Sequence, residues 1–274
     1  MPEGHTIHRA ARDHTHDLGG QRVLVSSPQD RLDVGALVDA SGRARLVRVE
    51  AYGKHLFYLF ERKKIVHVHL GLFGKLHRRK NPAPPARATT RMRLEGETTT
   101  IDLVGPTACH VIGVAEMREI TARLGPDPLR DDADPTPFFE RVARSKTPIA
   151  AMLLDQSVIC GVGNVYRAEI LHILRINPEA PASTVPARDV REIWRLAVGL
   201  LRRGVEEKRI VTTRGLELAR PRERVARAES TYVYGRSACR TCASDVLTYA
   251  LRGRIVHYCR ACQPFEHRLS ERAK

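Results

Sequence analysis

Residues 239–262 read CRTCASDVLTYALRGRIVHYCRAC, with two Cys-x2-Cys pairs separated by sixteen residues. Two such pairs joined by an insert of hairpin length present four thiolates tetrahedrally to one Zn²⁺. The segment has too little apolar volume to fold alone, and metal binding supplies about 10–16 kcal/mol in small zinc peptides. We therefore expect one structural Zn²⁺ per chain; four free or disulfide-bonded thiols are the alternative. The predicted ligands are Cys239, Cys242, Cys259 and Cys262.

The insert between the two pairs contains the run YALRGRIVHY, residues 249–258, which has the composition of a β-hairpin. Arg252 and Arg254 lie near its expected tip. Guanidinium groups at such a tip can hold phosphate through paired hydrogen bonds. Zinc ribbons have many functions, so the module alone does not define one.

The balance of charge points to a polyanionic partner. The chain has 274 residues, with 46 Lys and Arg against 31 Asp and Glu, a formal net charge of +15 and a sequence pI near 10.1. Each phosphate that a basic protein neutralises releases condensed counterions, which favours binding to nucleic acids. A basic surface without such a partner is the alternative.

The sequence contains no run of apolar residues near the about 20 that a membrane-spanning helix needs, and its first residues lack the apolar stretch of a signal peptide. We therefore expect a cytoplasmic protein that does not bind membranes and whose cysteines are mostly reduced. Cys109 and Cys160 lie far from the other four in sequence, and we expect both to be buried apolar side chains.

The first half of the chain predicts one helix followed by strands. Residues 3–18 have Ile7, Ala10, Ala11 and Leu18 at the spacing of a buried helical stripe. Short β-rich segments separated by polar turns then predict an antiparallel sandwich or barrel. The expected strands are Arg22–Ser26, Leu46–Phe60, Ile65–Leu70, Thr90–Leu94 and Thr98–Val104.

Composition changes at residues 125–135, where Gly, Pro and Asp predict a linker, and helical spacing follows. Thr136 is the expected N-cap of the first helix, with Pro137 at its first position. The expected helices are Thr136–Arg144, Pro148–Leu154, Val165–Leu174 and Val190–Val205. Charged residues 206–229 predict a mobile loop.

These patterns predict an α+β multidomain fold. It would comprise an N-terminal helix plus antiparallel β-sandwich in residues 1–125, a helical domain in 126–228 and a zinc-finger β-hairpin domain in 229–274.

The chain begins Met1-Pro2-Glu3. Removal of Met1 would leave the secondary amine of proline as the terminus, with a pKa near 8 that leaves a neutral fraction at neutral pH. Such an amine can attack a sugar C1′ and form an iminium, and a neighbouring carboxyl can move protons to the opening sugar. Pro-Glu at a chain start is common, however, and proves nothing alone.

Further motifs follow in order: Gly53-Lys54-His55-Leu56 in an expected strand, His69-Leu70-Gly71-Leu72-Phe73-Gly74, and Leu154-Asp155-Gln156 followed by GVGNVYRAE at 161–169. Together with the N-terminus and the cysteine module they cover nearly the whole chain. In this order they resemble the formamidopyrimidine-DNA glycosylase/endonuclease VIII family, and most closely its actinobacterial endonuclease VIII-like members.

The resemblance implies a helix–two-turn–helix domain between the sandwich and the zinc finger, and it implies roles for single residues. Pro2 would be the Schiff-base nucleophile and Glu3 the proton donor for base release. Lys54 would contact the phosphate at the lesion and assist β-elimination, and Arg254 would clamp phosphate and favour δ-elimination. Asn164, with the backbone amides near Gly163, would hold the DNA backbone.

Excision also requires the damaged nucleotide to leave the base stack, and a wedge fills the gap. Leu72 and Phe73 match the family position of this wedge; packing in the core is the alternative. Where the best-known endonuclease VIII has Gln-Leu-Tyr, this chain has Gly71 first, which leaves the opposite-base contact open. Glu169 would orient the proline amine or be a structural carboxylate, and His67 and His69 are expected to be structural.

The resemblance thus predicts a bifunctional DNA glycosylase and abasic-site lyase of base excision repair, which cleaves the strand by β,δ-elimination. Oxidised pyrimidines are favoured and oxidised purines remain an alternative. We expect a monomer whose partner is damaged double-stranded DNA, and single-stranded or bubble DNA are alternative partners. When bound to DNA, the enzyme would associate with the nucleoid. A non-catalytic damaged-DNA-binding protein and an RNA-associated zinc-ribbon factor are the competing hypotheses.

Overall fold

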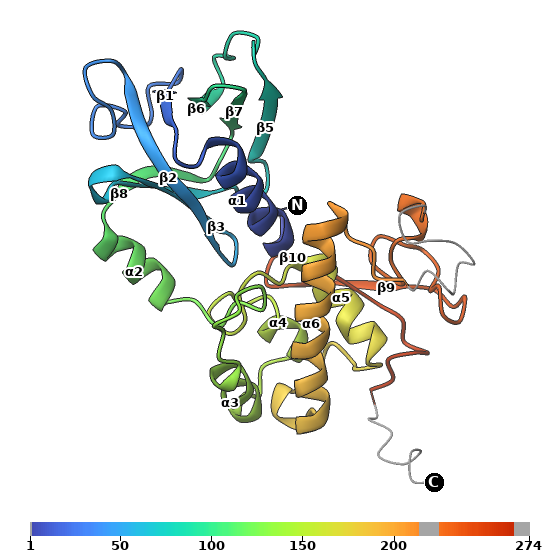
Figure 1. Cartoon of the computed structure of the whole chain (residues 1–274). Helices are drawn as coiled ribbons and strands as arrows, with labels where there is room; N and C mark the ends of the chain where they lie inside the picture. The colour runs from blue at the N-terminus through green and yellow to red at the C-terminus, as the bar shows by residue number, and fades with distance from the viewer. Residues whose placement is uncertain (1, 214–224, 266–274) are drawn as a thin grey trace. The chain divides into compact units, whose positions relative to one another are not determined.

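The computed structural model describes residues 2–213 and 225–265 (Figure 1). The chain divides into two compact units, Met1–Leu124 and Gly125–Lys274. Among the residues described, no helix is both long and apolar enough to cross a bilayer.

The first unit begins with α1 (Gly4–Leu18), which confirms the helix expected at residues 3–18. Ile7, Ala11 and Leu18 form its buried stripe and belong to the core of the sheet that follows. Burial of such a stripe against a sheet is what stabilises an amphipathic helix in water.

Eight antiparallel strands follow, in the spatial order β5-β7-β6-β1-β2-β3-β4-β8. Strand β2 joins two halves of this sheet: Arg43–Arg45 pair with β1, and residues from Leu46 onward pair with β3, with a register shift between Leu46 and Arg48 in the second pairing. Inward side chains of both halves share one apolar core with α1, which is the expected antiparallel sandwich. The strands are β1 (Arg22–Ser26), β2 (Arg43–Tyr52), β3 (His55–Phe60), β4 (Ile65–His69), β5 (Lys75–Lys80), β6 (Thr90–Glu95), β7 (Thr99–Val104) and β8 (Ala108–Ile112).

The single strand expected over Leu46–Phe60 is wrong, because the chain reverses in its middle. Tyr52 pairs with His55, and Gly53 and Lys54 form the turn between β2 and β3. Gly53 has φ 57°, a left-handed conformation that glycine adopts without steric cost. β-type residues continue on both sides, so the pattern alone does not reveal a two-residue reversal.

Strands β5 and β8 and helix α2 (Val114–Ala122) were not expected from the sequence. The β5 segment KLHRRK is cationic and lies at the edge of the sheet, where pairing with β7 determines its conformation. Helix α2 covers a small second apolar cluster that contains Phe57 and Ile65.

The second unit contains the expected helices, with bounds shifted by a few residues. They are α3 (Thr136–Arg144), α4 (Ile149–Met152), α5 (Asn164–Ile173) and α6 (Ala187–Glu207), and their apolar faces share one core. Thr136 is the first helical residue of α3 rather than its cap, and its backbone N–H donates to Asp134 Oδ1 at 2.9 Å. Short 3-10 turns occur at η1 (Glu61–Lys63) in the first unit and at η2 (Ala182–Thr184) and η5 (Arg227–Glu229) in the second.

Two segments differ from the linker and loop that the composition predicts. Residues 125–128 are buried, and the Gly125 N–H donates to the carbonyl of Gln156 at 2.9 Å. A Cβ at Gly125 would lie 2.5 Å from Val158, so close packing rather than flexibility explains this glycine. In the predicted loop 206–229, α6 continues to Glu207 and residues 211–213 are buried, while residues 214–224 lie outside the described part.

The C-terminal cysteine segment contains the expected hairpin, formed by β9 (Leu247–Leu251) and β10 (Arg254–Tyr258). Arg252 and Gly253 form its two-residue turn, with φ 49° and 71°. Positive φ at both central residues is the type I′ geometry, which matches the twist of a hairpin.

Candidate functional site

The four predicted metal ligands converge in the second unit. All four Sγ atoms lie within 4.8 Å of one another; Cys239 and Cys262 are 3.9 Å apart and Cys242 and Cys259 3.5 Å apart. Zn–S bonds of about 2.3 Å in a tetrahedron put the sulfurs about 3.8 Å apart. A disulfide would require about 2.05 Å. The cluster therefore fits a metal ion, and the alternative of disulfides is wrong.

Asn164 begins α5 and connects this helix to the cysteine hairpin. Its Nδ2 donates to the backbone carbonyl of Ile255 at 3.0 Å, and its Oδ1 accepts from Nη2 of Arg167. Arg167 is completely buried and also donates to the Ile255 carbonyl, at 3.1 Å. Ile255 follows Arg254 directly on β10. The side chains of Asn164 and Arg167 therefore fix the position of the strand that carries Arg254.

Arg167 had no role in the sequence interpretation. The available signal was its spacing: three residues after Asn164, it lies on the same face of α5. Arg252, at the tip of the hairpin, lies 3.9 Å from Asp155 Oδ2, which is a further link between the hairpin and the helical part of this unit.

Glu169 is a structural carboxylate within the second unit. It is completely buried on α5, and its Oε2 accepts from the backbone N–H of Tyr232 at 2.6 Å and from the Thr212 hydroxyl. Its Oε1 accepts from the backbone N–H groups of Val233 and Tyr234, at 3.0 and 2.9 Å. Burial raises the pKa of Glu169, and these hydrogen bonds oppose the rise because they favour the ionised form. The carboxylate thereby anchors the segment that leads into the cysteine module.

At the N-terminus, Pro2 directly precedes the N-cap of α1. Glu3 is that N-cap residue and is completely buried, whereas Pro2 is partly exposed. The Glu3 carbonyl accepts from the backbone N–H groups of Thr6 and Ile7 at 2.9 and 3.4 Å. The first helical turn thus fixes the backbone immediately after the proline.

Lys54 and the loop that contains Leu72 and Phe73 lie at the same end of the sheet. Lys54 immediately precedes β3, the loop follows β4, and His55 is the register partner of His69. Phe73 is 82% exposed and Leu72 45%, so packing in the core does not explain them. The structure therefore presents a cation and two apolar side chains together at one edge of the first unit.

Two glycines build this exposed tip. Gly71 has φ 64°, and a Cβ there would lie 1.8 Å from the Thr107 hydroxyl. A Cβ on Gly74 would lie 2.3 Å from the Leu70 carbonyl oxygen. The tip thus has no space for a side chain at position 71, which explains glycine there.

A neutral histidine cluster lies beside Lys54. Nδ1 of His55 and Nε2 of His67 are 2.8 Å apart, and the His55 ring centroid is 4.8 Å from that of His69. Burial, reinforced by the neighbouring imidazoles, lowers the pKa of His55 to about 3 and that of His67 to about 4. Burial also lowers the pKa of His69. The His67 ring stacks against both His55 and Phe57, at 5.1 Å between centroids in each case, which agrees with a structural role.

Family models match both units of the chain. The formamidopyrimidine-DNA glycosylase N-terminal domain matches residues 1–106, and the formamidopyrimidine-DNA glycosylase H2TH domain matches residues 124–215.

Two curated relatives extend the similarity over almost the full length. Endonuclease 8 1 of Mycobacterium tuberculosis (strain ATCC 25618 / H37Rv) is 41% identical over 274 residues, covering 96% of this chain and 100% of the relative. Probable endonuclease 8 2 of Streptomyces coelicolor is 31% identical over 278 residues, covering 96% of this chain and 94% of the relative.

Solved structures share the fold. The Lactococcus lactis Fpg in complex with DNA containing N7-benzyl-Fapy-dG has a TM-score of 0.79 at 19% identity, covering 96% of this chain and 100% of the other. The same enzyme in complex with DNA containing an oxidised pyrimidine has a TM-score of 0.78 at 18% identity, with the same coverage.

Proposed function

Because the chain belongs to the formamidopyrimidine-DNA glycosylase/endonuclease VIII family, we propose that it is a bifunctional DNA glycosylase and abasic-site lyase of base excision repair. The observation that carries the proposal is the start of the chain. Pro2-Glu3 stands directly before α1, Glu3 is buried at the N-cap, and the family match begins at residue 1. The proposed partner of this monomeric, cytoplasmic enzyme is damaged double-stranded DNA.

Pro2 is the proposed nucleophile once Met1 has been removed. Its neutral secondary amine attacks C1′ of the damaged nucleotide, and the base leaves with the electron pair of the C1′–base bond and takes up the proton that the amine nitrogen releases. The nitrogen lone pair then forms the iminium as the C1′–O4′ bond breaks. Glu3 supplies the proton that the opening sugar oxygen needs. Loss of the C2′ proton then expels the 3′ phosphate, and a second elimination expels the 5′ phosphate, which leaves a one-nucleotide gap.

Three groups are proposed to hold the DNA backbone. Lys54 contacts the phosphate at the lesion from the β2–β3 turn, and Arg254 clamps phosphate from the start of β10. The backbone amides at Gly163 and the first turn of α5 form the third group, because a helix N-terminus favours anions. The Asn164 side chain already binds Ile255 and Arg167, so we assign it the added role of positioning the Arg254 strand.

The wedge is assigned to Leu72 and Phe73. Their exposure on a tip beside Lys54 supports insertion into the gap that an extruded nucleotide leaves. Oxidised pyrimidines are the proposed substrates, in keeping with the endonuclease 8 names of the two relatives.

The cysteine cluster is assigned one structural Zn²⁺, since four thiolates without an open position favour this ion. The ion would fix the hairpin and supply no reacting group. The boundaries at residues 125/126 and 228/229 remain the proposed limits of three domains.

A panel of duplexes, each with one oxidised pyrimidine, one oxidised purine or one abasic site, tests the function. Excision of an oxidised pyrimidine with both 3′- and 5′-phosphate ends is the expected result, with the N-terminus of the enzyme checked by mass spectrometry. Tight binding to every duplex without cleavage by a chain that begins at Pro2 would contradict the proposal and favour a damage-binding protein. A preference for RNA at matched salt would favour the RNA-associated alternative.

A further inference from the structure

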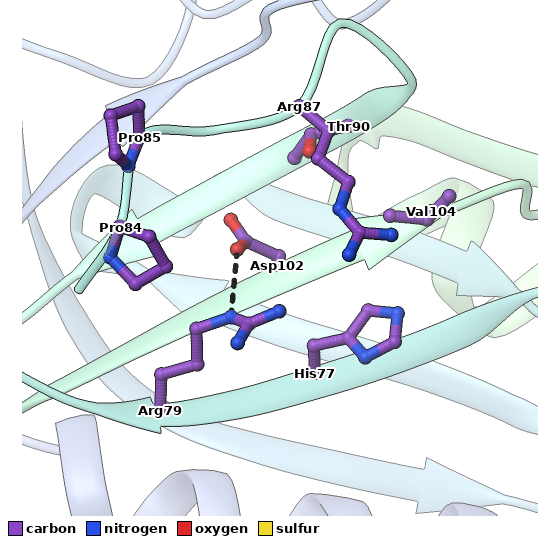
Figure 2. Close-up of a pocket in the computed structure, with 8 residues that line it drawn as sticks. All are labelled: His77, Arg79, Pro84, Pro85, Arg87, Thr90, Asp102 and Val104. Carbon is purple, nitrogen blue, oxygen red and sulfur yellow. Dashed lines mark ion pairs between the residues drawn. The ribbon is translucent and has the colours of Figure 1, made fainter.

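The first unit contains a basic hollow that none of the roles above uses. It has a volume of about 170 Å³ and lies against β5, β6 and β7 and the loop that precedes β6 (Figure 2). Its lining residues are His77, Arg79, Pro84, Pro85, Arg87, Thr90, Asp102 and Val104.

An ion pair fixes the floor and one wall of this hollow. Arg93 is 5% exposed, and its Nε and Nη2 donate to the two carboxylate oxygens of Asp102 at 2.7 and 3.0 Å. Arg93 Nη2 also donates to the Pro84 carbonyl at 2.8 Å, which holds the loop onto the sheet. The hollow is therefore a built feature, and its one carboxylate is already paired.

Further cationic donors line the same hollow. Arg79 comes from β5 and Arg87 from the loop, and Figure 2 shows both side chains with His77 around Asp102. Arg79 Nε is buried without a hydrogen-bond partner, and Asp102 Oδ2 lies 3.8 Å away, beyond hydrogen-bond range. Arg93 balances the charge of Asp102 from behind the lining, so the two lining arginines leave the site with a net charge of about +2.

We propose that this hollow binds a phosphate group, carried by a free nucleotide or by the end of a nucleic acid strand. Planar guanidinium groups form paired hydrogen bonds with phosphate oxygens, and a dianion matches the charge of the site. The volume equals that of about five or six waters, at about 30 Å³ each, which accommodates a phosphate and part of its ester. Pro84 and Pro85 supply the apolar wall against the ester.

The test is a titration of the full-length chain with inorganic phosphate at constant ionic strength, followed by ³¹P NMR. Arg79→Gln and Arg87→Gln should each weaken binding about tenfold, the loss of one charge-assisted contact. Lys80→Gln is the matched control: it removes one charge next to Arg79, but Lys80 is not part of the lining. Neither substitution removes a hydrogen bond of the Arg93–Asp102 pair, so melting temperatures should stay close to that of the parent chain.

A nucleoside 5′-monophosphate and duplexes with and without a 5′-phosphate separate the two sources. A preference for the phosphorylated duplex that Arg87→Gln removes assigns the site to strand ends. Arginine-dependent binding of the monophosphate with equal affinity for both duplexes assigns it to free nucleotides. Phosphate affinity that is undetectable, or equal in the Arg79→Gln, Arg87→Gln and Lys80→Gln variants, would overturn the proposal, whatever the outcome of the glycosylase assays.

Discussion

The side-chain amide of Asn164 donates to the backbone carbonyl of Ile255 across 3.0 Å and so connects the first residue of α5 to β10. Asn164 is 5% exposed. Arg167, one turn further along the helix, donates hydrogen bonds both to the Asn164 side chain and to the same Ile255 carbonyl. A residue that the family resemblance assigns to phosphate thus also determines where the strand that begins with Arg254 lies.

Asn164→Ala should therefore affect more than DNA contact. Loss of two buried hydrogen bonds should cost about 1–2 kcal/mol and lower the melting temperature by a few degrees. The ratio of δ- to β-elimination products should also fall, because Arg254 loses its fixed position. Product analysis on denaturing gels and thermal unfolding measure both effects. Arg254→Gln is the control and should give the same change in products with an unchanged melting temperature. If Asn164→Ala behaved like the parent chain in both assays, Asn164 would not position the Arg254 strand.

Phe73→Ala should impair extrusion of the damaged base from duplex DNA and leave the chemical steps intact. Because the ring is 82% exposed, the melting temperature should change by less than about 1–2 °C. Excision from duplex DNA should fall at least about tenfold, because the gap left by the nucleotide is no longer filled. Excision from single-stranded DNA should change little. Val47→Ala, at a residue 44% exposed in the same unit, is the control; equal duplex activity of the two variants would refute the wedge.

Acid should destabilise the first unit through its buried neutral histidines. Burial lowers the pKa of both His14 and His67 to about 4 from the ordinary 6.5. Between these values the unfolded chain binds more protons than the folded one, so the free energy of unfolding is highest above about pH 6.5 and falls as the pH drops toward 4. Denaturant unfolding at a series of pH values measures this slope.

His67→Phe preserves an aromatic ring in contact with His55 and Phe57 and should reduce the proton uptake on unfolding by about one. His16→Gln is the control, because the His16 side chain is 85% exposed. A parent chain whose stability does not change between pH 7 and 5 would contradict the role of histidine burial.

Removal of the metal should unfold the cysteine module. Elemental analysis should find one zinc per chain in the parent and less in Cys242→Ser. The apolar cluster around Cys239, Cys259 and Val233 is small, so chelation should abolish affinity for DNA and strand cleavage together. A zinc-depleted chain that retained both would show that the cysteines have another role.

The sequence predicts the elements in which periodicity and composition agree. Helix α1, the helices of the second unit and the cysteine cluster follow from apolar spacing or ligand spacing, and the structure confirms them. The turn at Gly53-Lys54 is missed because β-type residues continue across it. Strand β5 is missed because pairing with β7, rather than its own cationic side chains, determines its conformation.

The candidate site depends on contacts between residues distant in sequence, which no local pattern reveals. Arg167 and Glu169 are charged residues on a buried helix face, and the backbone groups of Ile255, Tyr232 and Tyr234 that they bind lie about 60 to 90 residues further along the chain. In the sequence, Gly71 resembles any glycine in a turn, and only the structure places Thr107 where a Cβ at position 71 would be. The motifs indicate which residues matter, and their contacts in the structure show which of them stabilise the others.

The proposed mechanism requires a covalent bond between Pro2 and the sugar, which borohydride trapping would preserve. A duplex with one abasic site is incubated with the parent chain, Pro2→Gly and Glu3→Gln, and the adduct is located by peptide mass spectrometry. We expect an adduct on the N-terminal peptide of the parent chain that is greatly reduced in Pro2→Gly. An absence of adduct from a parent chain that has a free proline terminus and binds the duplex tightly would contradict it.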